Sequence, residues 1–151
     1  YCHERIEALE LFPEAPEVIN KLHTKYFLGL ITNGPADIQR QEVVQLDLER
    51  YFDAVLIEGE LKMGKPKQEV MQHAEAQCGY SGEEILFVGN SYRHDMAPAM
   101  AAGWRNAWVR RPSDVPPSSK ETEPAPLPEG AQEPELTMGD LRELFGPLGL
   151  D

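Results

Sequence analysis

Short apolar runs alternate with helix-like segments along the chain as far as residue 111. Four runs have the length of buried parallel strands, in residues 27–31, 54–57, 85–88 and 106–109. Apolar residues recur at amphipathic-helix spacing before and between these runs, in residues 14–25, 36–46, 68–77 and 95–102. Because strand and helix alternate, the pattern predicts βαβ units. We therefore expect an α/β fold with a Rossmann-like, mostly parallel sheet and flanking helices.

The pattern changes at residue 112. Residues 112–134 hold seven of the 13 prolines, together with Glu, Ser and Ala. Such a composition buries little apolar surface, so it predicts a flexible acidic linker. After the linker, Thr137 is expected to cap a short final helix over residues 139–145, which has an apolar face that can dock on the sheet.

Charge and cysteine content exclude several classes of protein. The chain carries 26 acidic and 14 basic side chains, a net charge of −12, and no basic block that could neutralise nucleic-acid phosphates. No apolar run approaches the roughly 18 residues of a membrane span. Cys2 and Cys78 make no disulfide framework, which favours reduced thiols in a cytoplasmic protein. We expect neither a nucleic acid nor a membrane as partner.

The third apolar run leads into the most informative polar cluster. Asn90 and Ser91 follow the run directly, Asp95 comes five residues after Asn90, and a helix of small residues begins there. This order puts polar groups at the carboxyl end of a buried strand and beside a helix N-terminus, where open α/β sheets bind their ligands. Such a site suits a metal ion or a phosphate.

Three motifs in this order resemble those of the haloacid dehalogenase-like (HAD) hydrolase superfamily, specifically its phosphatase-type branch. Leu30-Ile-Thr-Asn-Gly34 is similar to the second motif of the family. Gly64-Lys-Pro66, before a helix, is similar to the lysine-bearing third motif. Val88-Gly-Asn-Ser-Tyr-Arg-His-Asp95 is similar to the acidic fourth motif. Each motif alone is weak, but the ordered trio, within a resemblance over roughly residues 12–111, is specific.

The resemblance implies a site for phosphoryl transfer, which depends on positioning and charge neutralisation. The Thr32 hydroxyl and the amides of Asn33 and Gly34 would hold the phosphoryl oxygens. Lys65 would place a positive charge beside the nucleophile and the phosphate. Thr32, Lys65 and Asp95 are thus the implied catalytic residues. Taken without the resemblance, residues 32–34 are also compatible with a strand-ending turn, and Lys65 with an exposed loop lysine.

The same resemblance implies a Mg²⁺ site in the fourth motif. Asp95 would bind the ion directly or through water, and Asn90 would be a neutral ligand or a neighbouring support. Asn90 stands where the family more often has Asp, which should weaken Mg²⁺ binding. Ser91 would support the site by donating a hydrogen bond to Asp95 or to the nucleophile. The alternatives are a helix N-cap for Asp95 and a loop hydroxyl for Ser91.

The first motif of the family is an Asp-x-Asp pair at the end of a central strand, and no such pair precedes residue 27. In the family this strand lies between the strands that carry Thr32 and Asn90. We therefore expect that the nucleophilic Asp lies upstream of Tyr1. We also expect that the first central strand and most of the cap are missing from this chain, and that another chain or fragment supplies the strand. The expected parts are a cap or linker remnant (1–13), a HAD-like α/β core (14–111), the linker (112–134) and a C-terminal helix docking on the core (135–151).

The main functional hypothesis is a Mg²⁺-dependent phosphatase that acts on a small phosphorylated metabolite through an aspartyl-phosphate. This chain alone is then expected to be inactive, because the nucleophile is absent. One alternative is a catalytically inactive HAD-like module for binding or assembly. Another is a different doubly wound fold, such as a receiver-like domain. Dehalogenase and phosphomutase chemistry stay open as well.

Overall fold

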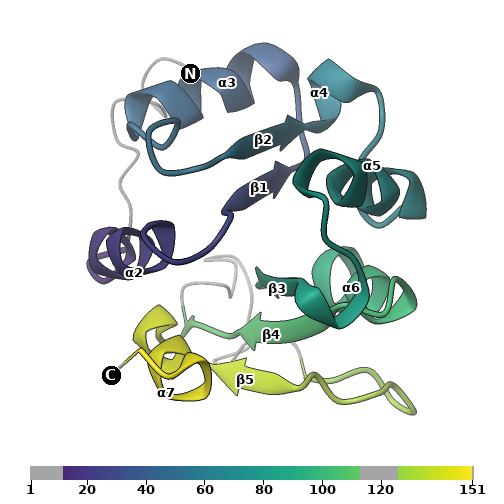
Figure 1. The fold of residues 1–151 in the computed structure, drawn as a ribbon. Helices are drawn as coiled ribbons and strands as arrows, with labels where there is room; N and C mark the ends of the chain where they lie inside the picture. Colours follow the sequence, from purple (N-terminus) through teal and green to yellow (C-terminus); the bar gives the residue numbers. More distant parts are fainter. Residues whose placement is uncertain (1–11, 113–125, 151) are drawn as a thin grey trace. The chain divides into compact units, whose positions relative to one another are not determined.

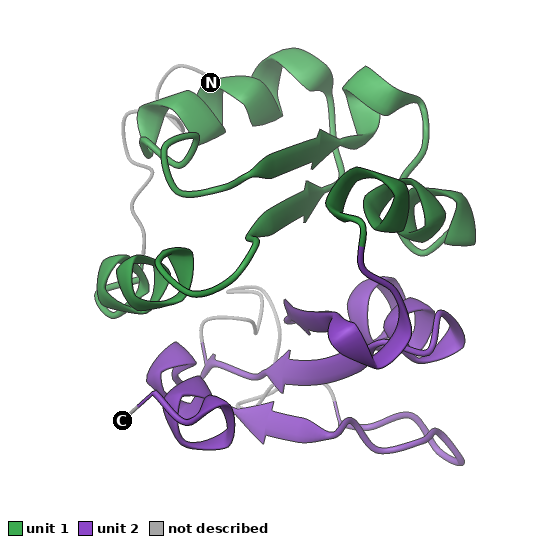
Figure 2. Cartoon of the chain, viewed as in Figure 1, with its two compact units in different colours: residues 1–79 green, residues 80–151 purple. Residues whose placement is uncertain are grey.

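Strands and helices alternate along the chain largely as the apolar pattern predicts (Figure 1). The computed structural model describes residues 12–112 and 126–150, which fall in two compact units, Tyr1–Gly79 and Tyr80–Asp151 (Figure 2). Every strand pairing in the described part of the chain is parallel. The predicted α/β class, with parallel strands and flanking helices, is confirmed.

The first unit is built on two parallel strands. Strand β1 (Gly29–Thr32) pairs with β2 (Ala54–Ile57) in a register that sets Thr32 opposite Ile57. The crossover between them contains α3 (Ala36–Gln45), since parallel neighbours need a long connection. The other helices of the unit are α2 (Ala15–His23), α4 (Glu58–Leu61) and α5 (Gln68–Cys78). Because the register is parallel, β1 and β2 end side by side.

Local sequence explains where these helices begin and end. Pro16 lies in the first turn of α2, where its missing N–H costs no helical hydrogen bond. Gly79 ends α5 in the left-handed conformation, with φ +78°, as predicted.

The apolar faces of the helices and strands of the first unit meet in a core that includes Val18, Val43, Leu56, Ile57, Val70 and Met71. Full burial of each larger side chain contributes about 1.5–3 kcal/mol.

The second unit contains three parallel strands in the order β3 (Leu86–Gly89), β4 (Arg105–Val109) and β5 (Leu136–Met138). A 3-10 helix, η1 (Gly82–Glu84), precedes β3. The crossover from β3 to β4 consists of a π-helical turn, η2 (Tyr92–Met96), and α6 (Ala97–Ala101). The buried apolar side chains of the second unit include Met96, Ala99, Trp104, Ala107, Trp108, Met138, Leu144 and Phe145.

The predicted C-terminal helix is only partly correct. Residues 136–138 form β5, so Thr137 lies in a strand opposite Trp108 and caps nothing. The helical turns follow as η4 (Leu141–Leu144) and α7 (Phe145–Leu148), and Asp140 caps them by accepting a hydrogen bond from the Arg142 amide at 2.8 Å. The edge of β4 was open to a strand, and pairing with it outweighed the weak helical preference of this segment.

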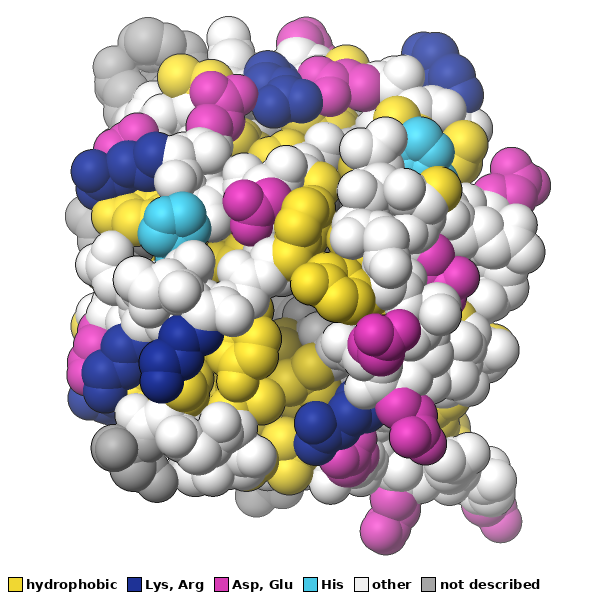
Figure 3. All heavy atoms as spheres, viewed as in Figure 1, with side chains coloured by type: hydrophobic (Ala, Val, Ile, Leu, Met, Phe, Trp, Pro, Cys, Tyr) yellow, Lys and Arg dark blue, Asp and Glu magenta, His cyan; other side chains and the backbone are white. Residues whose placement is uncertain are grey.

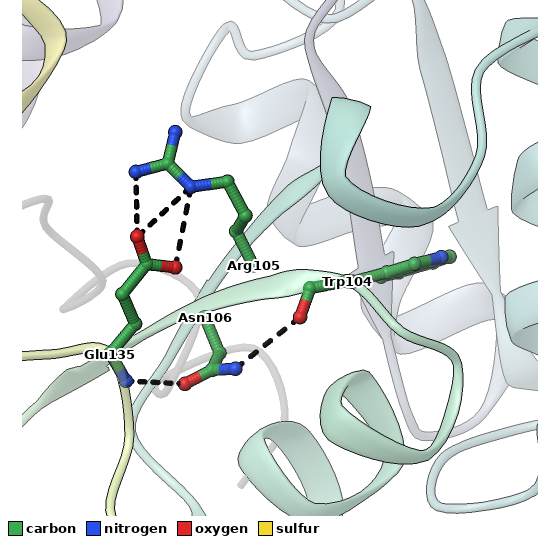
Figure 4. A network of polar contacts seen from close by, with 4 residues as sticks. All are labelled: Trp104, Arg105, Asn106 and Glu135. Atoms are coloured by element: carbon green, nitrogen blue, oxygen red, sulfur yellow. Dashed lines mark hydrogen bonds and ion pairs between the residues drawn. The ribbon is translucent and has the colours of Figure 1, made fainter.

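A polar network fastens the segment before β5 to β4 (Figure 4). The Glu135 amide donates to Asn106 Oδ1 at 2.8 Å, and Asn106 Nδ2 donates to the Trp104 carbonyl at 3.3 Å. Arg105 forms an ion pair with Glu135 at 2.7 Å, and its hydrogen bonds lower the pKa of that carboxyl. Asn106 is buried, so its amide needs these partners.

Two further boundaries differ from the prediction. The expected loop over residues 58–66 begins with α4, which ends at Lys62 in the left-handed conformation, φ +62°. The helix expected over residues 95–102 starts earlier, because the π-helical turn η2 begins at Tyr92. Both elements are four or five residues long, and such short elements leave little periodicity in a sequence.

Some predictions lie outside the described residues or are untested. The cap remnant falls mostly in residues 1–11 and the linker largely in residues 113–125, so the predicted division into parts stays a prediction. Within the described ranges, the second edges of β1 and β3 carry no strand pairing. No helix of those ranges combines the length and apolar character needed to cross a bilayer.

Candidate functional site

The loop after β1 turns directly into α3. Thr32 ends the strand and Ala36 begins the helix. Between them, Gly34 has φ +129°, a backbone conformation that favours glycine. A Cβ at this position would lie 3.0 Å from Gln39 Nε2. Glycine therefore allows the Thr32–Gly34 backbone to approach the first turns of α3 closely.

Asn33 joins this loop to the loop that carries Lys65. Asn33 Nδ2 donates to the Lys65 carbonyl at 2.8 Å, and the Lys65 amide donates to Asn33 Oδ1 at 2.9 Å. The side-chain amide thus makes the same paired contact that two strands make across a sheet. The structure brings together two motifs that are 32 residues apart in sequence.

Two groups that were expected to bind phosphoryl oxygens have partners within the first unit. The Thr32 hydroxyl donates to Gln39 Oε1 at 2.7 Å. The Gly34 amide donates to Glu58 Oε1 at 3.2 Å. Sequence reasoning missed both Gln39 and Glu58. The signal for Glu58 was its position directly after β2. Because Thr32 and Ile57 are paired at the ends of parallel strands, the residues that follow them lie at the same edge of the sheet.

Close backbone contacts fix the first residues of α4 against this loop. The Gly59 amide donates to the Gly34 carbonyl at 3.0 Å. A Cβ on Gly59 would lie 2.3 Å from the Ala36 backbone nitrogen. A Cβ on Gly64 would lie 2.2 Å from Glu58 Oε2, so the Glu58 side chain packs directly on the Gly64 backbone. Glycines 59 and 64 make this packing sterically feasible.

An exposed charge cluster links α3 and α4. Arg40 Nε donates to Glu60 Oε2 at 3.0 Å, and Arg40 Nη1 contacts Glu49 at 3.1 Å. The hydrogen bonds from Arg40 lower the pKa of Glu60. On the face drawn in Figure 3, acidic and basic side chains lie next to one another in several small groups. Surface pairs of this kind contribute little stability, about 0–1 kcal/mol each, so the loop contacts position the site more than these charges do.

In the second unit, Asp95 lies inside η2 with its side chain buried at 3% exposure. The Ser91 amide donates to Asp95 Oδ2 at 3.0 Å, and the Asp95 amide donates to the Ser91 carbonyl at 2.9 Å. A Cβ on Gly89 would lie 2.4 Å from Asp95 Oδ2. The carboxylate is thus held against the end of β3 by its own loop.

Ser91, and not Asp95, is the N-cap of this turn. Its Oγ accepts a hydrogen bond from the His94 amide at 3.1 Å and contacts His94 Nδ1 at 3.2 Å. The N-cap alternative for Asp95 is therefore wrong, because Asp95 lies within the helical turn. The contact expected between Ser91 and Asp95 exists, but the backbone N–H makes it and the hydroxyl does not.

Asn90 is fixed through its backbone. Its carbonyl accepts a hydrogen bond from Trp108 Nε1 at 3.1 Å. The Trp108 ring is packed edge-on against Tyr92, with centroids 5.6 Å apart, and Arg110 lies over it at 4.6 Å. Asn90 itself is exposed. An aromatic cluster on β4 and η2 therefore orients the loop in which Asn90 and Asp95 lie.

Two side chains in this loop offer oxygen ligands for a hard cation. Asp95 and Asn90 offer oxygen atoms, which Mg²⁺ prefers, and Mg²⁺ often binds proteins through one or two carboxylates and completes its shell with water and phosphate. No group of three or more His, Cys, Asp or Glu side chains arranged for a metal ion occurs in residues 12–112 and 126–150. Asp95 and Asn90 are thus the residues of this loop that could hold such an ion.

The expected site residues fall into two groups, one in each unit. Thr32, Asn33, Gly34 and Lys65 lie together in the first unit. Asn90, Ser91 and Asp95 lie together in the second. Their common participation in one pocket stays a prediction, as do their individual roles.

Comparisons with known proteins add to this geometry. The sequence profile of the haloacid dehalogenase-like hydrolases matches residues 1–109. A phosphoserine phosphatase from Thermus thermophilus is 35% identical over 139 residues, which is 89% of this chain and 50% of that protein. A phosphoglycolate phosphatase from Salmonella typhimurium is 34% identical over 98 residues, 64% of this chain and 38% of that protein. The chain thus spans half or less of the length of these relatives.

Solved structures show the same fold. A HAD phosphatase from Thermococcus onnurineus superposes with a TM-score of 0.79 at 23% identity, covering 99% of this chain and 63% of that one. A 2-haloacid dehalogenase from Pseudomonas syringae gives a TM-score of 0.76 at 26% identity, covering 98% of this chain and 56% of that one. Enzymes of different chemistry share this architecture, so the fold alone does not select the reaction.

Proposed function

The chain belongs to the haloacid dehalogenase-like hydrolase family, and on that premise we propose that it is part of a Mg²⁺-dependent phosphatase acting on a small phosphorylated metabolite. Two relatives with 34–35% identity are named as phosphatases, which supports phosphate monoester hydrolysis over dehalogenation. The observation that carries the proposal is the paired hydrogen bonding between Asn33 and Lys65. It joins the loop with the proposed oxyanion donors to the loop that carries Lys65.

In this proposal the first unit binds the transferring group. The Thr32 hydroxyl and the Asn33 and Gly34 amides donate to the phosphoryl oxygens. Lys65 offsets the repulsion between the anionic nucleophile and the phosphate. The Asn33–Lys65 contact fixes the backbone that carries these donors before the substrate arrives. The Thr32 hydroxyl and the Gly34 amide then exchange their partners Gln39 and Glu58 for phosphoryl oxygens.

The second unit holds the metal in this proposal. Asp95 and Asn90 are the residues that would bind Mg²⁺, which, when bound, neutralises charge on the phosphoryl oxygens. Ser91 keeps the Asp95 carboxylate in place through its amide. Asn90 contributes a neutral oxygen where a carboxylate would add charge, so the affinity for the ion is expected to be reduced.

The nucleophile is proposed to lie upstream of Tyr1. The sequence contains no Asp-x-Asp pair, and the match covers only 50% and 38% of the two phosphatase relatives. An upstream Asp would attack phosphorus and form an aspartyl-phosphate, with release of the alcohol, and water would then hydrolyse the acyl phosphate. This chain alone is then inactive until another chain or fragment supplies that strand. A cytoplasmic location, expected from the cysteines, belongs to the same proposal.

The test uses the protein extended by its upstream coding sequence. Hydrolysis of an aryl phosphate with Mg²⁺ is measured for the parent and for Lys65→Met and Asp95→Asn. We expect each substitution to lower kcat/KM by about 10²–10³, the usual cost of losing a fixed electrostatic partner in an active site. Lys67→Met, a change at an exposed neighbouring lysine, is the matched control and should retain full activity. Unchanged turnover in Lys65→Met and Asp95→Asn would overturn the site.

Asn90, at a position where the family more often has Asp, favours a second candidate, a catalytically inactive module for binding or assembly. This candidate predicts no turnover of any aryl phosphate by the extended protein, and stable association of the chain with another protein. Turnover that depends on Lys65 would exclude it.

A further inference from the structure

The Gly34 amide has an anionic partner supplied by the chain itself. Glu58 Oε1 accepts its hydrogen bond at 3.2 Å. The neighbouring Thr32 hydroxyl, in contrast, donates to the neutral side chain of Gln39. A carboxylate oxygen on a backbone N–H has the charge and the geometry of a phosphate oxygen on the same donor. One of the donors proposed to bind phosphate is therefore covered by an internal anion.

Packing holds Glu58 in this position. The residue starts α4 directly after β2, and its own carbonyl accepts from the Lys62 amide at 2.8 Å, which closes the short helix. Its Oε2, Cδ and Cγ atoms lie so close to Gly64 that a Cβ there would meet them at 2.2–2.8 Å. The backbone directly after Glu58 is held against the Gly34 loop, because the Gly59 amide donates to the Gly34 carbonyl. The carboxylate thus lies between the Gly34 loop and the loop that leads to Lys65.

We propose that Glu58 is an internal competitor for the phosphate site, whose carboxylate must leave the Gly34 amide before a phosphate oxygen can bind there. The inference rests on the proposed function, because it takes the Gly34 amide to be a phosphate donor. It adds a specificity-determining residue to that site. Glu58 weakens the binding of free inorganic phosphate, so a substrate needs further contacts to displace it.

The expected size follows from the population of the open form. An amide that is covered in nine of ten molecules binds its ligand about tenfold more weakly than an open one. Like-charge repulsion between the displaced carboxylate and the phosphate adds to this factor. Neutralising Glu58 should therefore tighten the binding of inorganic phosphate about tenfold or more.

The experiment follows the Gly34 amide of the ¹⁵N-labelled protein, extended by its upstream coding sequence, by NMR during titration with inorganic phosphate at constant pH. The parent is compared with Glu58→Gln, which removes the charge, and with Glu58→Asp, which keeps the charge but shortens the side chain by one methylene. Glu69→Gln, at an exposed position in the first turn of α5, is the matched control for net charge. Thermal unfolding of each variant shows whether the fold is kept.

We expect Glu58→Gln to lower the Kd for phosphate at Gly34 about tenfold, Glu58→Asp to lower it less, and Glu69→Gln to leave it unchanged. Equal affinities in the parent and in both Glu58 variants would overturn the competition while leaving the phosphate site intact. An equal gain in Glu58→Gln and Glu69→Gln would mean that net charge alone acts, and it would also overturn the inference. If the Gly34 signal responds in none of the proteins, the phosphate site itself is contradicted, and the inference falls with it.

Discussion

The two units hold their site residues in different ways. In the first unit, Asn33 reaches across 32 residues of sequence to the Lys65 backbone. In the second, Asp95 is held by Ser91, four residues away. The first arrangement forms only when β1, β2 and the loops after them are in place. The Ser91–Asp95 contact forms within one turn, while Trp108 of β4 holds the Asn90 carbonyl of the same loop. The comparison separates a loop contact that depends on tertiary folding from a carboxylate contact that forms within one turn.

Gly59→Ala should have the largest effect, because it attacks the tertiary arrangement. Its Cβ would lie 2.3 Å from the Ala36 nitrogen and 2.9 Å from the Gly34 carbonyl oxygen, and both belong to the backbone. We expect a loss of about 2–3 kcal/mol in the free energy of unfolding, as for other overpacked sites, measured by urea denaturation. Gly29→Ala, where a Cβ meets nothing within 4 Å, is the control. Equal stability of the two variants would contradict the close contact.

Asn33→Ala removes both hydrogen bonds between the two loops. We expect a loss of about 2 kcal/mol from two bonds of about 1 kcal/mol each, together with a change in the Lys65 amide signal. Asn33→Asp keeps the acceptor for the Lys65 amide and loses the donor, so it should lose about half as much. If neither variant moves the Lys65 signal, the loops are not joined through Asn33.

Ser91→Ala tests the local arrangement. Loss of the N-cap should cost about 1 kcal/mol, and the NMR changes should stay within residues 89–96 and the Trp108 indole that contacts them. Ser91→Asn retains a cap acceptor and should recover most of the stability. Shifts spreading over the whole of β4 would show that this turn is less self-contained than its contacts indicate.

The smallest effect concerns a second local pair in the same unit, Asp140 and Arg142. The Arg142 side chain and amide hydrogen-bond to the Asp140 carboxylate and lower its pKa to about 2. Because the folded pKa is depressed, this contribution to stability is present above the ordinary pKa of Asp and is lost as pH falls through that range toward about 2. NMR titration should give a pKa of about 2 in the parent and a higher value in Arg142→Gln, which stays below the ordinary one because the amide of residue 142 still donates to Asp140. Identical titration curves would contradict the pair.

The sequence predicted the elements whose cause is local. Residues 54–57 were predicted as a strand with the bounds that β2 has, and Gly79 was predicted as a helix end. Residues 136–138 were misjudged, because a three-residue strand is stable only beside the edge of β4. Glu58 was missed for a related reason. Its importance comes from the β1–β2 register, which no single segment contains.

The candidate site shows the same division. The motifs picked out Asn33 and Lys65, but not the contact between them, since a side-chain amide can bond to many backbones. Asp95 was identified by its place after a strand, but the close packing of its carboxylate against Gly89 was not predicted. Composition and spacing thus identify which residues carry charge, and long-range packing decides which atoms those charges meet.

The Asn33–Lys65 contact also closes a non-covalent ring around α3, β2 and α4. A proteolytic cut inside that ring, for example between α3 and β2, would break the covalent path between the two loops. The side-chain amide and the β1–β2 ladder would still hold its ends together. We therefore expect a nicked chain to migrate as one particle under native conditions and as two fragments only after denaturation.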